Sequence, residues 1–455
     1  HCSRVFPAAK LYLMKTFEVK TLGCKVNQYE SQSLREKLLA LGFKESLRAG
    51  ADIYVVNTCA VTQKAGQESA AAIRRFNSLN PKAKIFVTGC SASHSHSELK
   101  NITGVACVLE NSLKENLPEF ILRKTRETSP ENPGDSLGFG HRSPNHGLVA
   151  YKPFISTFHK HTRAFLKIQD GCNNGCSYCI IPKLRGSSRS RPLPEIIGEA
   201  KGLVGNGYKE LVLCWICLGD YVSGLGLSQG LVRLITALEK IEGLLRIRLS
   251  SIEARDVSHE LISLMAYSKK ICPHLHIPFQ SADDKVLQLM NRKMLSGGYR
   301  KLVQRLREFI PSIGITTDIM VGFPGEDGES FNNTVMFLKE VMPSRIHVFS
   351  FSPREGTPAF NLQARARPQV VKERQGQIKA LARELALGFY RAHLSKPLEV
   401  LVESSPAGNN DAFYKGYSGN YIKVFIPKSE HLVNTVVTVR PIGIYRDGLL
   451  ARVQK

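Results

Sequence analysis

Short apolar runs and longer amphipathic stretches alternate between residues 15 and 125. The pattern predicts strands at 16–22, 52–58 and 84–88, and helices at 29–41 and 63–79. In the first helix Leu34, Leu38 and Leu41 share one face, and Gly42 follows as a stop signal. Because strands separated by helices form parallel sheets, this region is predicted to be a parallel α/β domain.

A second alternating region begins after a stretch rich in proline and glycine at 126–160, which is predicted to be a linker. Each apolar run of the second region is followed by a helical pattern, and the predicted strands are 164–169, 210–216, 245–250, 274–279, 315–321 and 345–350. Six β-then-α units in succession predict a barrel or partial barrel.

The last part of the chain holds short strand patterns only, at 398–403, 413–417, 421–426, 435–440 and 449–453. Gly, Pro and Asn separate them, which is typical of a small β-barrel of OB-like size. The fold class is therefore α/β, with a C-terminal β-barrel. The predicted domains are an extension without an assigned role at 1–14, an N-terminal domain at 15–125, the linker at 126–160, a barrel core at 161–392 and the β-barrel at 393–455.

Composition narrows the class of protein. Lys and Arg number 62 against 39 Asp and Glu, a formal net charge of +23, which favours a polyanionic partner such as nucleic acid. A generally basic soluble protein would show the same excess of Lys and Arg, so charge alone does not show whether the partner is nucleic acid. No apolar run approaches the roughly 18 residues of a membrane span. The 11 cysteines in a long chain indicate reduced thiols, some of them metal ligands, and a cytoplasmic protein.

Three of these cysteines form a C-x₃-C-x₂-C loop, Cys172, Cys176 and Cys179, directly after the first predicted strand of the core. Three thiolates on one loop hold three irons of a 4Fe–4S cluster and leave one iron open, as a catalytic metal site requires. A structural zinc site is the alternative, but it would need a fourth ligand. The position of the loop on the barrel favours the cluster.

Three other cysteines each follow a predicted strand of the N-terminal domain: Cys24, Cys59 and Cys90. Any one alone would be read as a small buried hydrophobic residue. Because the carboxyl ends of parallel strands meet at one edge, the three together predict a second three-thiolate cluster. Cys214 and Cys217 form a C-x-x-C inside an apolar run, where residues three apart point to opposite faces, and no shared metal is expected.

The cysteine loop on a partial barrel resembles the radical S-adenosylmethionine (SAM) superfamily, and the two cysteine sets together resemble the methylthiotransferases. The resemblance covers residues 15–455. The sequences TLGCKVNQYES at 21–31 and NTCAVT at 57–62 resemble the branch acting on N6-threonylcarbamoyladenosine in tRNA. In the last domain, Gly416-Tyr417-Ser418 with Asn420-Tyr421 resembles the RNA-binding TRAM domain of that branch.

The resemblance implies conversion of this nucleoside, at position 37 next to the anticodon, to its 2-methylthio derivative. The adenine C2–H is not acidic enough for a side-chain base, so a 5′-deoxyadenosyl radical made from SAM abstracts the hydrogen. The implied cofactors are SAM and two 4Fe–4S clusters. The implied partners are the tRNA anticodon stem-loop, an electron donor and a sulfur donor.

The resemblance also assigns site residues, none of them a catalytic acid or base. The cluster ligands are Cys24, Cys59, Cys90, Cys172, Cys176 and Cys179. The SAM-binding residues are Tyr178, Glu253, Gln280 and Asp318. The RNA-binding residues are Arg185, Arg189, Arg191, Tyr417, Tyr421 and Lys423.

One departure from the family pattern lies where the second core strand ends near SAM. The family has Thr-Gly, a hydrophobic residue and Asn, whereas this chain has Cys214-Trp215-Ile216-Cys217. Three alternatives therefore stay open: a methylthiotransferase for isopentenyladenosine in tRNA, one for a ribosomal protein, or an iron–sulfur tRNA-binding protein without turnover.

Overall fold

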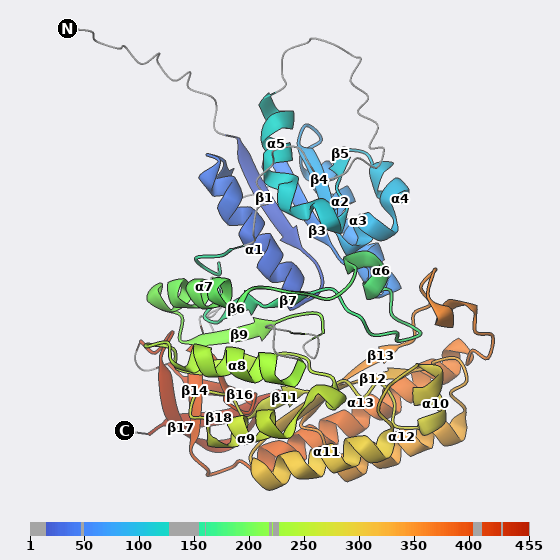
Figure 1. Ribbon diagram of the computed structural model, residues 1–455, viewed down its shortest axis with the longest axis vertical. Coiled ribbons are helices and arrows are strands. Elements are labelled where there is room, and N and C mark those ends of the chain that lie inside the picture. Colours follow the sequence, from blue (N-terminus) through green and yellow to red (C-terminus); the bar gives the residue numbers. More distant parts are fainter. Residues whose placement is uncertain are drawn as a thin grey trace. The chain divides into compact units, whose positions relative to one another are not determined.

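A computed structural model describes most of the chain, in two compact units (Figure 1). The described residues are 15–46, 50–126, 154–159, 161–217, 221, 227–403, 412–428 and 431–454. The first unit extends to Phe154 except for Val61–Gln63, which belong with the second unit, Ile155–Lys455. The predicted extension at 1–14 and most of the predicted linker lie outside the described residues.

The N-terminal unit is built on a parallel sheet with strand order β2-β1-β3-β4-β5. Its strands are β1 Thr16–Thr21, β2 Lys44–Glu45, β3 Ile53–Thr58, β4 Lys84–Gly89 and β5 Val105–Val108. Its helices are α1 Lys25–Ala40, α2 Gln63–Leu79, α3 Cys90–His94, α4 His96–Lys100 and α5 Leu117–Arg126. This confirms the predicted parallel α/β domain.

Helices cover both faces of this sheet. Along the fully buried central strand β3, Ile53 and Val55 pack in one apolar cluster, which contains Leu34 of α1. The alternate residues of β3 pack in a second cluster, which contains Ile73 of α2. A strand buried on both faces appears in sequence as a continuous apolar run, and this explains the pattern at the predicted strand.

The second unit begins with six parallel strands, which confirms the predicted partial barrel. They are β6 Ala164–Lys167, β9 Glu210–Cys214, β10 Arg246–Leu249, β11 His274–His276, β12 Gly314–Val321 and β13 Arg345–Ser350. They pair in the orders β6-β9-β10 and β11-β12-β13, and the bridges Ile247–Ile271 and Ser251–His276 join the two halves.

Helices and one short ribbon complete this core (Figure 1). The longer helices are α7 Leu193–Gly205, α8 Leu227–Glu239, α9 His259–Tyr267, α11 Ser296–Phe309, α12 Gly328–Val341 and α13 Pro368–Arg391. The ribbon pairs β7 Gln169–Asp170 with β8 Arg189–Ser190, and the short helices are α6 Ile181–Arg185 and α10 Asp284–Leu289. No described helix is both long and apolar enough to cross a membrane.

A closed barrel with strand order β14-β15-β16-β18-β17 ends the chain, as predicted. Its strands are β14 Leu398–Glu403, β15 Phe413–Ser418, β16 Lys423–Pro427, β17 Val436–Tyr445 and β18 Gly448–Val453. Alternate residues such as Val400, Val424 and Leu449 fill its interior. The barrel belongs to the same compact unit as the core.

Candidate functional site

The three-cysteine loop lies between β7 and α6, beyond the carboxyl end of β6. Cys172, Cys176 and Cys179 are partly buried and form no disulfide bond. Gly171 has φ +73°, and a Cβ there would lie 2.1 Å from the carbonyl oxygen of Ser187, so only glycine allows the two ends of the loop to approach this closely. The backbone therefore presents all three thiols from one tight loop.

The surroundings of the sulfur atoms suit an anionic iron–sulfur cluster. The Asn174 backbone N–H donates to Cys172 Sγ at 3.3 Å, and Arg292 Nη1 donates to Cys176 Sγ at 3.8 Å. Burial raises the pKa of Cys179 to about 12, so iron would have to displace the thiol proton on binding. Within the described ranges, no three His, Cys, Asp or Glu side chains converge as a single metal ion requires.

Glu253, predicted to bind SAM, lies beside this loop. Its carboxylate accepts two bonds from Arg292, at 2.9 and 2.6 Å, and the same arginine contacts Cys176. The Nε of Arg292 is buried and has no hydrogen-bond partner among the described residues. A buried donor beside the cysteine loop fits a polar ligand such as SAM. Arg292 was not predicted, because nothing in its local sequence distinguishes it from other basic residues.

Tyr178 projects from the loop into an apolar cluster. Its ring meets Phe323 edge-on, with 6.4 Å between centroids, and burial raises its pKa well above the ordinary value. The hydroxyl therefore stays protonated, and the side chain anchors the cysteine loop to the segment that follows β12.

Gln280 and Asp318, the other predicted SAM-binding residues, lie together near the carboxyl ends of β11 and β12. Gln280 has φ +65°, and its backbone N–H donates to the Asp318 carbonyl at 2.8 Å. His276 Nε2 lies 3.2 Å from the Asp318 carboxylate, and His276 Nδ1 lies 2.9 Å from Thr316 Oγ1. His276 is thus a further residue of the predicted SAM-binding group, to which the sequence alone assigns no role.

The Cys214–Cys217 segment differs from its prediction. Strand β9 ends at Cys214, so the rule that strand residues three apart face opposite sides does not apply to Cys217. Asn174 Nδ2 donates to Cys217 Sγ at 3.2 Å, which places this thiol beside the cysteine loop. The Trp215 indole N–H donates to the carbonyl of Ser251, just beyond β10, so Trp215 joins two neighbouring strand ends.

We expect Trp215→Phe to destabilise the protein by about 1–3 kcal/mol, because the part-buried carbonyl of Ser251 loses its donor while the apolar volume is largely kept. Chemical denaturation compared with the wild type measures this. A variant of unchanged stability but tighter SAM binding would instead mean that the indole obstructs the SAM pocket.

In the N-terminal unit, Cys24, Cys59 and Cys90 follow the adjacent strands β1, β3 and β4. The glycines before Cys24 and Cys90 let these strand ends approach closely. A Cβ on Gly23 would lie 2.8 Å from Cys59 Sγ, and one on Gly89 would lie 2.4 Å from the Thr58 carbonyl oxygen. Three thiol-bearing strand ends at one sheet edge fit the predicted second cluster.

Two of the three predicted RNA-binding arginines in the loop region are engaged inside the protein. Arg185 bonds Asp170 at 2.9 Å with a fully buried side chain, and Arg191 bonds Glu199 at 2.7 Å. These ion pairs give Arg185 and Arg191 a partner within the chain, and their predicted contact with RNA stays a prediction. Arg189 is exposed and remains available to a phosphate.

The predicted base-stacking tyrosines pack against the core. Tyr421 stacks on His274 at 4.6 Å and on Tyr417 at 5.1 Å, and the Arg248 guanidinium lies 4.8 Å from its centroid. Arg163 lies 4.8 Å from the Tyr417 centroid. Both tyrosines remain half-exposed, and their predicted contact with RNA stays a prediction. Lys423, the remaining predicted residue, pairs with Asp447 at 2.5 Å and is partly exposed.

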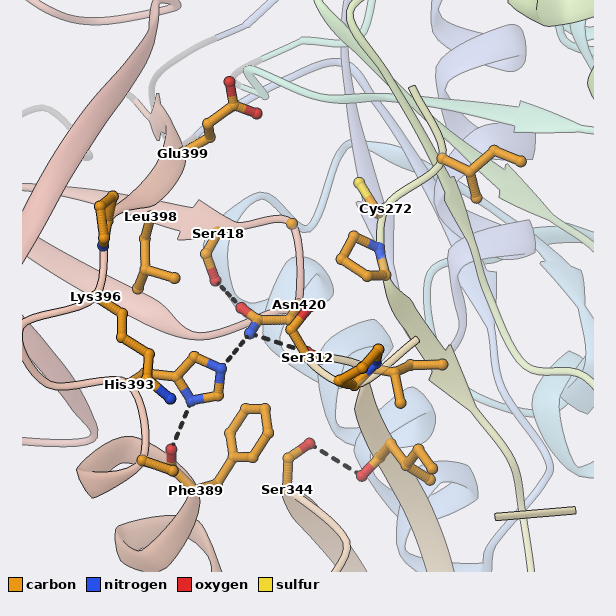
Figure 2. A pocket seen from close by; sticks show the side chains of 18 of the residues that line it. Cys272, Ser312, Ser344, Phe389, His393, Lys396, Leu398, Glu399, Ser418 and Asn420 are labelled. Carbon is orange, nitrogen blue, oxygen red and sulfur yellow. Dashed lines mark hydrogen bonds between the residues drawn. The ribbon is translucent and has the colours of Figure 1, made fainter. Parts of the chain in front are cut away.

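A cavity of about 1120 Å³ lies between the core and the C-terminal barrel (Figure 2). In its wall Asn420 Nδ2 donates to His393 Nε2 at 2.9 Å, and His393 Nδ1–H donates to the Phe389 carbonyl at 2.8 Å. The lining residues Pro273 and Ile313 precede β11 and β12, so the cavity adjoins the amino ends of the strands. Since barrel active sites lie at the carboxyl ends, this cavity is separate from the candidate site.

A cysteine loop on the first strand of a six-stranded partial barrel defines a radical SAM protein. The family model of the Radical SAM superfamily matches residues 166–338, and that of uncharacterized protein family UPF0004 matches residues 16–110. A radical SAM methyltransferase structure, TsrM from Kitasatospora setae, superposes with a TM-score of 0.54 at 15% identity, covering 76% of this chain and 75% of that one. This likeness supports the fold.

Similar sequences identify the family more narrowly. The chain is 36% identical to threonylcarbamoyladenosine tRNA methylthiotransferase MtaB of Bacillus subtilis, over 97% of both chains. It is 34% identical to tRNA-2-methylthio-N(6)-dimethylallyladenosine synthase of Clostridium novyi, over 88% of both. The chain belongs to the tRNA methylthiotransferase family. It is a radical SAM enzyme of the sulfur-group transferase type, with SAM and a 4Fe–4S cluster as cofactors and tRNA as substrate.

Proposed function

We propose that this enzyme converts N6-threonylcarbamoyladenosine to its 2-methylthio derivative at position 37 of tRNA, in the anticodon stem-loop. The observation that carries the proposal is the 36% identity to the Bacillus subtilis relative of that name over 97% of both chains. The sequences at 21–31 and 57–62 match the same branch.

We propose Cys172, Cys176 and Cys179 as ligands of the cluster that works with SAM. When bound, the cluster and SAM would supply the radical that removes the adenine C2 hydrogen. The protein side chains hold and orient the site: Arg292 fixes the Glu253 carboxylate beside Cys176, and His276 fixes Asp318. Glu253, Gln280 and Asp318 are proposed to contact SAM, and Tyr178 to hold the loop.

We propose a second 4Fe–4S cluster on Cys24, Cys59 and Cys90, which would carry the sulfur to be inserted. The close approach of the strand ends at Gly23 and Gly89 supports it. Cys24 is the N-cap of α1, and the positive end of a helix favours negatively charged groups. The proposed reaction also requires a sulfur donor and an electron donor as partners, and we propose that it takes place in the cytoplasm.

We propose the C-terminal barrel as a TRAM domain that binds RNA, with Tyr417, Tyr421 and Lys423 among its contacts. A neighbouring group supports this: the half-buried rings of Tyr445 and Phe413 lie 5.2 Å apart. The exposed Arg446 lies 5.0 Å from the Tyr445 centroid. Aromatic rings beside cations are what single-stranded RNA loops require.

Nucleoside mass spectrometry of tRNA from a deletion strain tests the function. We expect the 2-methylthio derivative of threonylcarbamoyladenosine to disappear, its precursor to accumulate, and the plasmid-borne gene to restore the product. Loss of the dimethylallyladenosine derivative instead would assign the chain to the other branch. If neither nucleoside changed and the reduced protein made no 5′-deoxyadenosine from SAM, the non-catalytic alternative would hold.

We expect Lys423→Ala combined with Arg446→Ala to weaken tRNA binding and flatten its salt dependence. Each lost phosphate contact should lower the slope of log affinity against log salt by roughly 0.7. Binding titrations over a range of salt concentrations measure it, with Lys301→Ala, an exposed lysine of α11, as the matched control. An unchanged slope in the double variant would move the RNA contacts elsewhere.

A further inference from the structure

We propose that Cys217 is a fourth thiol ligand of the Cys172–Cys179 cluster, occupying the open iron until SAM displaces it. The proposal rests on the radical SAM cluster of the proposed function and adds a resting state to it. The family pattern to which the chain was compared has Asn at this position.

The first support is the position of the thiol. One residue, Asn174, contacts two sulfur atoms: its backbone N–H donates to Cys172 Sγ at 3.3 Å, and its side-chain Nδ2 donates to Cys217 Sγ at 3.2 Å. Cys217 is thus a fourth cysteine beside a three-cysteine loop. Four thiolates are the usual ligand set of a 4Fe–4S cluster, and three leave one iron to be filled.

The second support is that the segment bearing Cys217 is held in place. The side chain of the fully buried Gln169 accepts from the backbone N–H groups of Ile216 and Cys217, both at 3.1 Å. The same side chain donates to the Gly171 carbonyl at 2.7 Å, immediately before the cysteine loop. The Trp215 indole fixes the segment to the end of β10. The backbone at Cys217 is therefore held beside the loop, so that only its side chain has to turn when the thiol leaves the iron.

The exchange requires no redox partner. The Fe–S bond to Cys217 forms as its thiol proton leaves to solvent, and it breaks when the amino and carboxylate groups of SAM take the iron and the thiol regains a proton. Thiolate and SAM compete for one iron, so the resting enzyme binds SAM with a lower apparent affinity. In return, the open iron is protected from loss.

The test compares wild type, Cys217→Asn and, as matched control, Cys214→Ala, which removes the other buried thiol of the same segment. All three are made as full-length reconstituted protein, with Cys24, Cys59 and Cys90 replaced by alanine so that one cluster remains. Without SAM, each is treated with ferricyanide and examined for bound iron and for the electron paramagnetic resonance signal of a 3Fe–4S cluster.

Without SAM, we expect Cys217→Asn to lose iron and develop the 3Fe–4S signal, while the wild type and Cys214→Ala resist. In holoenzyme with all N-terminal cysteines present, Cys217→Asn should bind SAM about tenfold more tightly. Equal iron retention and equal SAM affinity in the three proteins would overturn the proposal. Because neither measurement uses tRNA, an incorrect nucleoside assignment would leave both results unchanged.

Discussion

Replacing Cys172, Cys176 and Cys179 together with alanine should abolish SAM cleavage completely while the iron of the N-terminal unit stays bound. The three thiols come from one loop, and Cys217, the fourth proposed ligand, cannot hold a 4Fe–4S cluster alone, so their loss should empty the site. The N-terminal sheet belongs to a different compact unit with its own apolar clusters, and it should fold as before. Iron content and 5′-deoxyadenosine formed from SAM by the reduced protein measure the two effects.

The reciprocal variant is the control. Alanine at Cys24, Cys59 and Cys90 should lower the iron content, leave SAM cleavage intact and stop insertion of sulfur into tRNA. If this variant kept all of its iron, the second cluster would be excluded. Loss of SAM cleavage in both triple variants would mean that the two sites are not separable.

The parts of the fold that the sequence predicted are those in which local pattern and burial coincide. Strand β3 is buried along its whole length, and its apolar run was recognised to within one residue. Strand β5 was not predicted: its apolar run is only four residues long, and those residues are mostly half-exposed or exposed. Helix α1 begins at Lys25, earlier than predicted, because its first turn buries the polar Asn27, which donates to the Leu22 and Thr58 carbonyls.

The candidate site divides in the same way. Cysteine ligands are encoded by spacing along one loop or by their place after a strand, and both features are local. The roles of charged and aromatic residues depend on partners far away in the chain. Arg191 is neutralised by Glu199 on α7, and Tyr421 of the barrel is covered by His274 of β11. No local sequence pattern distinguishes a charged or aromatic residue that has a distant partner within the chain from one whose side chain is exposed to solvent.

The attachment of the C-terminal barrel to the core depends on one buried carboxylate. Glu210 of β9 is fully buried, and Arg248 Nε contacts it at 2.6 Å. Arg246 and Arg163 lie 3.6 and 3.8 Å from the same carboxylate. The three arginines in turn bond the barrel. Arg248 donates to the Gly419 and Ser418 carbonyls, Arg246 to those of Tyr417 and Glu399, and Arg163 to the Glu403 carboxylate.

Glu210→Gln should therefore destabilise the second unit by about 3–5 kcal/mol, because it leaves the buried guanidinium groups of Arg246 and Arg248 without their shared anion. Denaturation midpoints measure the loss, and hydrogen exchange should show faster opening of β14 and β15 than in the wild type. Glu308→Gln, an exposed carboxylate of α11, is the matched control and should change stability by less than about 0.5 kcal/mol.

The dependence of this effect on pH follows from the same cluster. Burial alone would raise the pKa of Glu210, but Arg248 and Arg163 outweigh it and hold the pKa below the ordinary value of 4.5. The ionised carboxylate thus contributes its full stability above pH 4.5, and the contribution falls as the pH drops through the folded-state pKa. The stability difference between wild type and Glu210→Gln should be constant near neutral pH and shrink only in acid below pH 4.5. A difference that already shrank between pH 7 and pH 5 would show that another group controls the attachment of the barrel.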